Sequence, residues 1–242
     1  MTEAAFPFTI RRVLDPTEEE TVAIIDVMTE AFKTDPGSVL GFGRYLDVVI
    51  RPRNEFVVRA VLKTGEVYVC EDPKTNRIAA VATWLPPGKE AYETEAESQA
   101  AWDAIKVLFP EEERRWLEEY ATGTHQLVVD SIGPNAERDE WYLQRIGVHP
   151  DYRGQGIASR MIKEQLKKTD PHSVALQCTE NMVSSPFDSK KKTVATYRRP
   201  KVEYYKRLDW EVKGKQSYTT LGGDITLYVM LRPPSKGQAS AT

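Results

Sequence analysis

The chain of 242 residues is poor in metal-binding and cross-linking side chains, with two cysteines, Cys70 and Cys178, and three histidines. Two cysteines exclude a disulfide framework and a zinc site built from thiolates. Three scattered histidines disfavour a histidine metal site. We therefore expect no bound metal.

Long apolar runs and an excess of charge of one sign are also missing. No apolar run approaches the roughly 18 residues of a membrane-spanning helix, and residues 1–7 lack the basic-then-apolar order of a signal peptide. Lysine and arginine number 33 against 36 acidic residues, a formal net charge of -3, so no general nucleic-acid footprint is present. We expect a protein that is cytoplasmic, or both cytoplasmic and nuclear, and that binds neither membranes nor nucleic acids.

The 40% of hydrophobic residues suffices for a substantial core, and their spacing predicts mixed secondary structure. Pro52 should kink or divide the second helix, and the turn at 72–76 should join two strands into an antiparallel hairpin. These elements indicate an α/β (α+β) protein. The predicted strands are 8–13, 65–71, 77–84, 141–148, 173–179, 211–218 and 224–231, and the predicted helices are 17–32, 40–62, 155–168 and 200–209.

Residues 90–119 differ in composition from the rest of the chain, with ten acidic and three basic residues. Apolar residues at helical spacing predict two amphipathic helices here, divided near Pro110 and followed by a loop at 131–140. We name residues 90–122 the acidic insertion. Its charge is either a solvated helical face or a wall that attracts a cationic substrate.

The most informative stretch is the strand at 141–148 and the turn after it. Arg153, Gly154, Gln155, Gly156 and Ala158 open the following helix. Small residues let a ligand approach the backbone closely, and free N–H groups at a helix start favour an anion. This turn predicts a pyrophosphate site.

The stretch resembles the GNAT superfamily of acyl-CoA-dependent N-acetyltransferases, whose signature is Arg/Gln-x-x-Gly-x-Gly/Ala after a strand ending in Val-x-Pro. Here Arg153-x-x-Gly156-x-Ala158 follows Val148-His149-Pro150. The later segment Tyr204 to Val212 resembles the family's Leu-Tyr-Glu-Lys-Leu-Gly-Phe, with Asp209 in place of the glycine. Within the superfamily, the chain most resembles the puromycin-acetyltransferase-like branch, on features of low specificity. The resemblance implies one domain over residues 1–232, with a mixed, mostly antiparallel sheet flanked by helices, and a disordered tail at 233–242.

The resemblance also implies acetyl-CoA as co-substrate and a set of residues that bind it. Backbone groups of Ile146, Gly147 and Val148 would pair with the pantetheine arm as an extra strand would. Arg153 would either add charge to the pyrophosphate site or be a surface arginine, and His149 would be a turn residue. The pyrophosphate would be cradled by Gly154, Gln155, Gly156, Ile157, Ala158 and Ser159.

The reaction implied is direct attack of a neutral amine on the acetyl carbonyl, which the Val148 N–H would polarise. Tyr205 would protonate the departing thiolate, with Tyr204 as the alternative, because a thiolate leaves more easily when a proton is delivered. Gln144, where many relatives carry a glutamate, cannot act as the base. Glu71, Asp130 or a water chain remain as bases, and Cys178 is expected in the core.

The acceptor is expected to be a small-molecule amine, cationic and partly apolar, because of the acidic insertion and the aromatic residues. A protein lysine or N-terminal amine is an alternative, and so is a non-catalytic acyl-CoA-binding module. The lysine-bearing segment 181–199 is predicted to be a loop, either solvated, closing over the acceptor, or contacting the 3′-phosphate of CoA. The chain should act as a monomer or homodimer.

Overall fold

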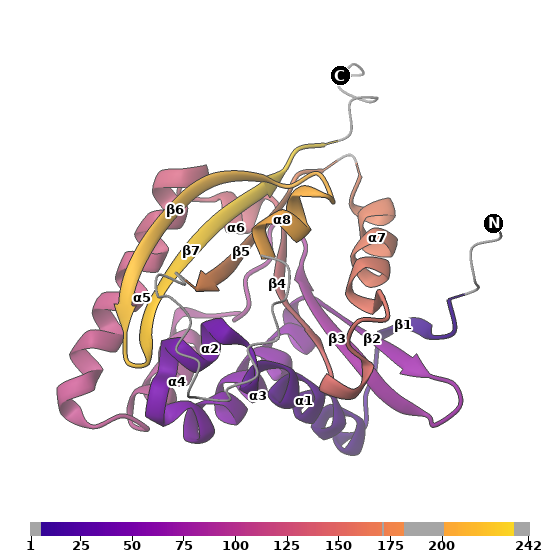
Figure 1. Cartoon of the computed structure of the whole chain (residues 1–242), viewed down its shortest axis with the longest axis horizontal. Coiled ribbons are helices and arrows are strands. Elements are labelled where there is room, and N and C mark those ends of the chain that lie inside the picture. The colour runs from indigo at the N-terminus through magenta and orange to yellow at the C-terminus, as the bar shows by residue number, and fades with distance from the viewer. Residues whose placement is uncertain (1–5, 171, 182–200, 235–242) are drawn as a thin grey trace, which may run out of the picture.

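The structure is a computed structural model that describes residues 6–170, 172–181 and 201–234. The described residues form one seven-stranded sheet in the order β1-β2-β3-β4-β5-β7-β6. Only β4 and β5 pair in parallel; all other neighbours are antiparallel. The mixed, mostly antiparallel sheet flanked by helices is therefore confirmed (Figure 1). The elements are β1 (Thr9–Val13), α1 (Glu18–Lys33), α2 (Pro36–Phe42), η1 (Gly43–Tyr45), α3 (Leu46–Thr64), β2 (Glu66–Asp72), β3 (Arg77–Leu85), α4 (Glu95–Lys106), α5 (Glu111–Ile132), α6 (Ala136–Asp139), β4 (Trp141–Val148), η2 (Pro150–Tyr152), α7 (Ile157–Thr169), β5 (Val174–Asn181), α8 (Lys201–Lys206), β6 (Glu211–Thr220) and β7 (Gly223–Arg232).

Two apolar clusters lie on opposite faces of the sheet. On one face, α1 and α3 bury Ile24, Ile25 and Val58 against strand residues such as Val67 and Val81. On the other face, α7 and α8 pack on a second cluster that contains Ile157, Ile162, Tyr205, Ala80, Ala82 and Leu176. Because successive side chains of a strand point to opposite faces, Val81 and its neighbours Ala80 and Ala82 are divided between the two clusters.

Most predicted elements are confirmed to within two residues. Thr17 caps α1, its hydroxyl accepting a hydrogen bond from the Glu20 N–H at 3.2 Å. The β2–β3 hairpin closes through the Asp72 carboxylate, which accepts from the Lys74 N–H at 2.9 Å. The local signals of cap and turn therefore determined these boundaries.

The sequence predicts that Pro52 kinks or divides the second helix, and the division is wrong. Pro52 lies inside the continuous helix α3, and the chain instead breaks at η1, between α2 and α3. The break accommodates the β6–β7 turn, whose Gly222 N–H donates to the Leu40 carbonyl at 2.7 Å. Tertiary packing, not the proline, sets where the helix is interrupted.

The acidic insertion forms α4 and α5, divided at Pro110 as predicted, but α5 continues to Ile132. The loop predicted at 131–140 is wrong in part, since α5 fills its start and α6 most of its end. The longer helix is explained by a second apolar contact, in which Leu127 and Val128 pack against Leu227 and Val229 of β7. The yellow β6–β7 ribbon lies along α5 in Figure 1.

Three sequence predictions fall outside the described residues. The first is the lysine-bearing loop at 181–199, of which only residue 181 is described. The second is Pro200 as the first residue of α8, and the third is the tail at 233–242, of which only residues 233 and 234 are described. Across the described part of the chain, no helix is both long and apolar enough to cross a membrane.

Candidate active site

The sheet opens between β4 and β5, which pair in parallel. The two strands pair at three positions, from Trp141 opposite Val174 to Leu143 opposite Leu176. Both strands then continue, β4 to Val148 along β3 and β5 to Asn181 along β7, without pairing to each other. Figure 1 shows the two ribbons diverging. We name the space between residues 144–148 and 177–181 the strand gap.

The pairing of β4 with β3 determines which backbone N–H groups of β4 face the strand gap. The His149 N–H donates to the Ala79 carbonyl at 2.9 Å. In an antiparallel pair, hydrogen-bonded and non-bonded residues alternate, so the N–H groups of Ile146 and Val148 point away from β3 and toward the gap. An extended ligand chain could pair with this free edge as an added strand.

A β-bulge and a glycine place this edge against α1. The register shifts at Gln144, where Thr83 pairs with Arg145 and Trp84 with Leu143. Gly147 then faces α1, and a Cβ atom on it would lie 2.8 Å from the Ala31 Cβ and 3.0 Å from the Met28 Sδ. A glycine is therefore required for the close approach of β4 to α1.

The turn after β4 forms an open, glycine-lined helix start. Gly154 and Gly156 have φ values of 81° and 75°, and a Cβ atom on either would meet nothing within 4 Å. Gly156 is the N-cap of α7 and has no side chain with which to cap it. The N–H groups of the first turn, Ile157 to Ser159, therefore have no partner within the helix, and this arrangement fits a pyrophosphate.

Arg153 makes structural contacts at the end of the gap. Its Nε donates to the Val148 carbonyl at 3.1 Å and its Nη2 to the Ala31 carbonyl at 2.8 Å. These bonds hold the end of β4 to α1. His149 lies in the turn, as predicted, with its Nδ1 accepting from the Asp151 N–H at 3.3 Å.

The two tyrosines of α8 differ in their contacts. The Tyr204 hydroxyl accepts from the Ser159 hydroxyl at 3.1 Å, which ties α8 to the start of α7. Tyr205 is buried, and burial, together with the charges of Cys178, Tyr204 and Asp35, raises the pKa of its phenol. Such a phenol stays protonated near neutral pH and can donate a proton.

A helix-ending motif fixes the position of Tyr205. The Trp210 N–H donates to the Tyr205 carbonyl at 3.2 Å and the Asp209 N–H to the Lys206 carbonyl at 3.1 Å, the two bonds of a Schellman motif. Asp209 is in the left-handed conformation at φ 69°, where the family pattern has glycine. The Trp210 ring lies 5.8 Å from the Tyr205 ring, between centroids, and completes the motif's apolar contact.

Asp35, which sequence reasoning missed, is a carboxylate that joins two elements beside these groups. Its charge acts on Tyr205 and Cys178 on one face of the sheet and on Arg145 on the other. One carboxylate oxygen caps α2 through the Ser38 N–H at 3.1 Å, and the other binds the Lys201 ammonium at 2.5 Å. The Asp-Pro pair at a helix boundary was the available signal.

The two carboxylates predicted as bases lie elsewhere. Glu71 is on β2, separated from β4 by β3, and binds the Arg11 guanidinium at 2.7 Å. Asp130 is exposed on α5 and accepts from the Gln126 amide at 2.8 Å. Neither residue is placed to take a proton at the strand gap.

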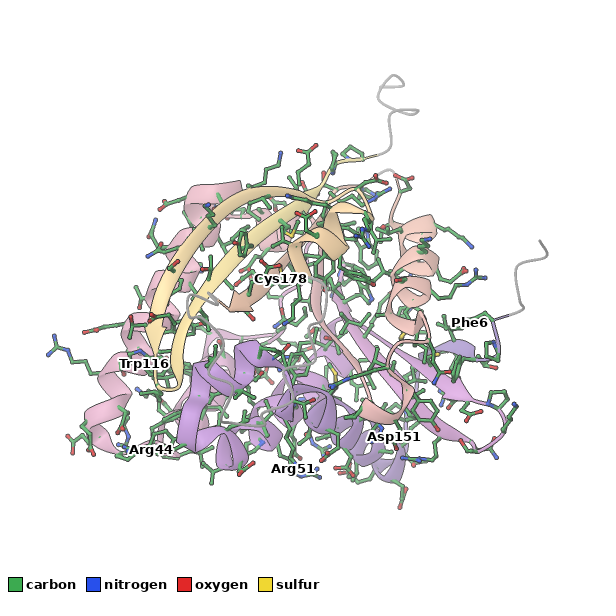
Figure 2. All side chains as sticks on the ribbon, in the orientation of Figure 1. Phe6, Arg44, Arg51, Trp116, Asp151 and Cys178 are labelled. Carbon is green, nitrogen blue, oxygen red and sulfur yellow. The ribbon has the colours of Figure 1, made fainter. Side chains whose placement is uncertain are left out.

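Cys178 is in the core, as predicted. Figure 2 shows it near the centre of the molecule, by α8 and β5. Burial raises the pKa of its thiol to about 12, so the thiolate is absent at neutral pH. Within the described ranges, no three histidine, cysteine, aspartate or glutamate side chains gather into a metal-binding group.

Most of the acidic side chains of the acidic insertion point to solvent, although its Tyr92 is close enough to Arg145 to interact with it electrostatically. Its acidic side chains Glu111, Glu112, Glu118 and Glu119 are exposed, and Glu113 binds Arg44 at 2.5 Å. Figure 2 shows Arg44 and Trp116 at the outer side of the molecule, apart from Cys178. The charge of these helices therefore forms a solvated face, and it gives no support to a wall that attracts a cationic substrate.

Residues 117–212 match the family described as Acetyltransferase (GNAT) domain. Among solved structures, the chain is similar to a Corynebacterium glutamicum protein described as histone acetyltransferase HPA2 and related acetyltransferase, with 16% identity, coverage of 96% of this chain and 99% of that chain, and a TM-score of 0.57. It is also similar to mosquito arylalkylamine N-acetyltransferase like 5b (14% identity, 93% and 99% coverage, TM-score 0.56). Arylalkylamine N-acetyltransferase 2 of Aedes aegypti gives 10% identity, 93% and 98% coverage and a TM-score of 0.56.

Proposed function

We propose that the chain is a member of the GNAT superfamily, whose acetyltransferase domain its residues 117–212 match, and that it transfers the acetyl group of acetyl-CoA directly to a primary amine of a small molecule. The observation that carries this proposal is the strand gap, where the free N–H groups of Ile146 and Val148 lead to the uncapped start of α7. These groups match the two parts of the co-substrate, an amide-bearing arm and a pyrophosphate.

Acetyl-CoA, when bound, supplies the activated thioester. Gly154 to Ser159 hold its pyrophosphate through the N–H groups of α7, and the backbone of Ile146 pairs with its pantetheine arm. Glycines at 154 and 156 leave open space beside the backbone, since a Cβ atom on either would meet no described atom within 4 Å.

The chemical step depends on three groups of the chain. The Val148 N–H donates to the carbonyl oxygen as negative charge develops there. The Tyr205 phenol, which is protonated at neutral pH, donates its proton to the departing sulfur, and the second proton of the attacking nitrogen then restores the phenol. Asp35 binds Lys201 at the start of α8 and so helps to position the helix that carries Tyr205, while the incoming ammonium group loses its proton to water.

Two observations support a small acceptor over a protein one. The polar groups at the gap, Tyr205 and Arg145, are buried, which fits an enclosed acceptor better than a surface groove for a peptide. Two proteins of similar fold are arylalkylamine N-acetyltransferases. The expectation of a cationic acceptor now rests on its amine alone, because the acidic insertion faces solvent.

Free-thiol release from acetyl-CoA over a panel of small amines and lysine peptides tests the proposal. We expect thiol release with small amines, and a fall in kcat of about 100-fold or more in Tyr205→Phe, because the phenol no longer donates a proton. Tyr204→Phe is the matched control and should keep most of the activity. Binding of acetyl-CoA without thiol release for any amine would instead indicate a non-catalytic acyl-CoA-binding module.

A further inference from the structure

A buried polar cluster lies on the face of the sheet that α1 and α3 cover. Arg145 of β4 is 8% exposed, and its Nη1 donates to the Asn54 Oδ1 of α3 at 2.6 Å. Thr83 pairs with Arg145 across β3 and β4, and both Thr83 and Asn54 are fully buried. We name Arg145, Asn54 and Thr83 the arginine cluster.

The arginine cluster contains donors that the protein does not use. The Asn54 Nδ2 and the Thr83 Oγ1 are buried and have no hydrogen-bond partner among the described residues. Buried polar atoms are nearly always hydrogen-bonded, and each exception calls for an explanation. An amide N–H₂ and a hydroxyl beside a guanidinium form a donor-rich site, the environment that an anion requires.

The positive charge of the cluster has no carboxylate in direct contact with it among the described residues. The Arg145 guanidinium lies over the Phe32 ring, 5.2 Å from its centroid, and Arg53 lies over the Phe42 ring at 5.3 Å. Among the described residues, neither guanidinium forms an ion pair at 4.0 Å or less. Burial and the charge of Arg53 lower the pKa of Arg145, and the opposing charge of Asp35 does not offset them.

The arginine cluster adjoins the proposed reaction centre. Arg145 immediately precedes Ile146, whose backbone faces the strand gap, and the charge of Asp35 acts on Arg145 and Tyr205 alike. The contacts of Arg145 with Phe32 and Asn54 place it on the α1 and α3 face, opposite to α7, where the CoA pyrophosphate is proposed to bind. A CoA phosphate at α7 therefore leaves this charge unmatched.

We propose that the arginine cluster, with Arg53, binds a carboxylate of the acceptor, so that the substrate is a primary amine that also carries a carboxylate. This inference rests on the proposed acetyl transfer. A carboxylate accepts two parallel bonds from a guanidinium and has oxygen lone pairs left for the Asn54 amide and the Thr83 hydroxyl. The carboxylate would fix the distance at which the amine meets the strand gap, and that distance selects among amino acids by chain length.

The test compares two matched series of acceptors in thiol-release kinetics. One series runs from glycine through β-alanine to longer ω-amino acids, and the other consists of the alkylamines with the same carbon chains. We expect one amino acid length to exceed its matched alkylamine in kcat/KM. In Arg145→Gln, which retains a donor for Asn54, the ratio of kcat/KM between this amino acid and its matched alkylamine should fall by about 10- to 100-fold.

Two further variants separate binding of the acceptor from folding. Arg53→Gln tests the same charge should Arg145→Gln fail to fold, and Arg51→Gln is the matched control, because Arg51 is on the same helix but pairs with Asp26 outside the cluster. Acetylation of alkylamines with no preference for carboxylates overturns this inference and leaves the proposed function intact. Loss of acetyl-CoA binding in Arg145→Gln also overturns it, since the arginine would then serve the co-substrate. Failure of both series, with acetyl-CoA still bound, contradicts the proposed function itself.

Discussion

Single side chains at the strand gap are held by backbone geometry as much as by their own contacts. Tyr205 is the clearest case, because the Schellman motif that ends α8 carries both its carbonyl bond and its ring contact with Trp210. The motif needs a left-handed residue, and Asp209 supplies it at φ 69°. Asp tolerates this conformation less well than Gly, so the position of Tyr205 carries a conformational cost.

Substitution of Asp209 should therefore change stability in opposite directions. Asp209→Gly removes the Cβ strain and should raise the free energy of unfolding by about 1 kcal/mol, while Asp209→Val should lower it by about 1 to 2 kcal/mol. Urea unfolding at neutral pH measures both. A less stable glycine variant would show that the Asp209 side chain contributes more than its backbone conformation costs.

The helices and strands around the gap could be predicted from the sequence only in part, because some of their boundaries depend on contacts between distant segments. The two hairpins, the cap of α1 and the β4 strand followed from local signals, because alternation and turn residues act within a few positions. The bulge at Gln144 did not, since it depends on how β3 and β4 register, and neither did the extension of α5, which depends on contact with β7. Arg145 and Asp35 were missed for the same reason: a lone charged residue in a sequence is typical of the surface.

The contact of β4 with α1 can be tested by a paired substitution. Gly147→Ala should destabilise the protein by about 1 to 3 kcal/mol, because the new Cβ would lie 2.8 Å from the Ala31 Cβ. Ala31→Gly removes that neighbour. Alone it should destabilise the helix, but in the Gly147→Ala background it should cost less stability than it does in the wild type. A double-mutant cycle in urea measures the coupling, and strictly additive effects would contradict the close approach.

At the scale of the whole molecule, one buried carboxylate joins the edge of the sheet to α7. Glu66 of β2 binds Lys168 of α7 at 2.5 Å and Arg12 of β1 at 3.1 Å. Burial alone would raise the pKa of Glu66, but hydrogen bonds from Lys168 and Tyr68 and the charges of Lys168 and Arg12 outweigh it, and the pKa is lowered. The folded protein thus binds this proton less tightly than the unfolded chain does.

This linkage predicts an acid-dependent loss of stability. A lowered pKa contributes stability above the unfolded value, and the contribution is lost as pH falls through the folded value. Urea unfolding from about pH 5 to about pH 3 should therefore show a shallower decline in Glu66→Gln than in the wild type, together with lower stability at pH 7. Glu112→Gln, an exposed control, should follow the wild type. Equal slopes for Glu66→Gln and the wild type would contradict the linkage.

The central claim is that the strand gap and the start of α7 bind acetyl-CoA, and thermal unfolding with and without it is the most direct test. At 100 times its dissociation constant the co-substrate should stabilise the protein by about 2.7 kcal/mol. Ala158→Glu places a negative charge in the first turn, which suits the helix itself but repels a pyrophosphate, so the shift should disappear. Lys163→Glu, an exposed change further along α7, should keep it. No shift in the wild type, or an undiminished shift in Ala158→Glu, would contradict the account.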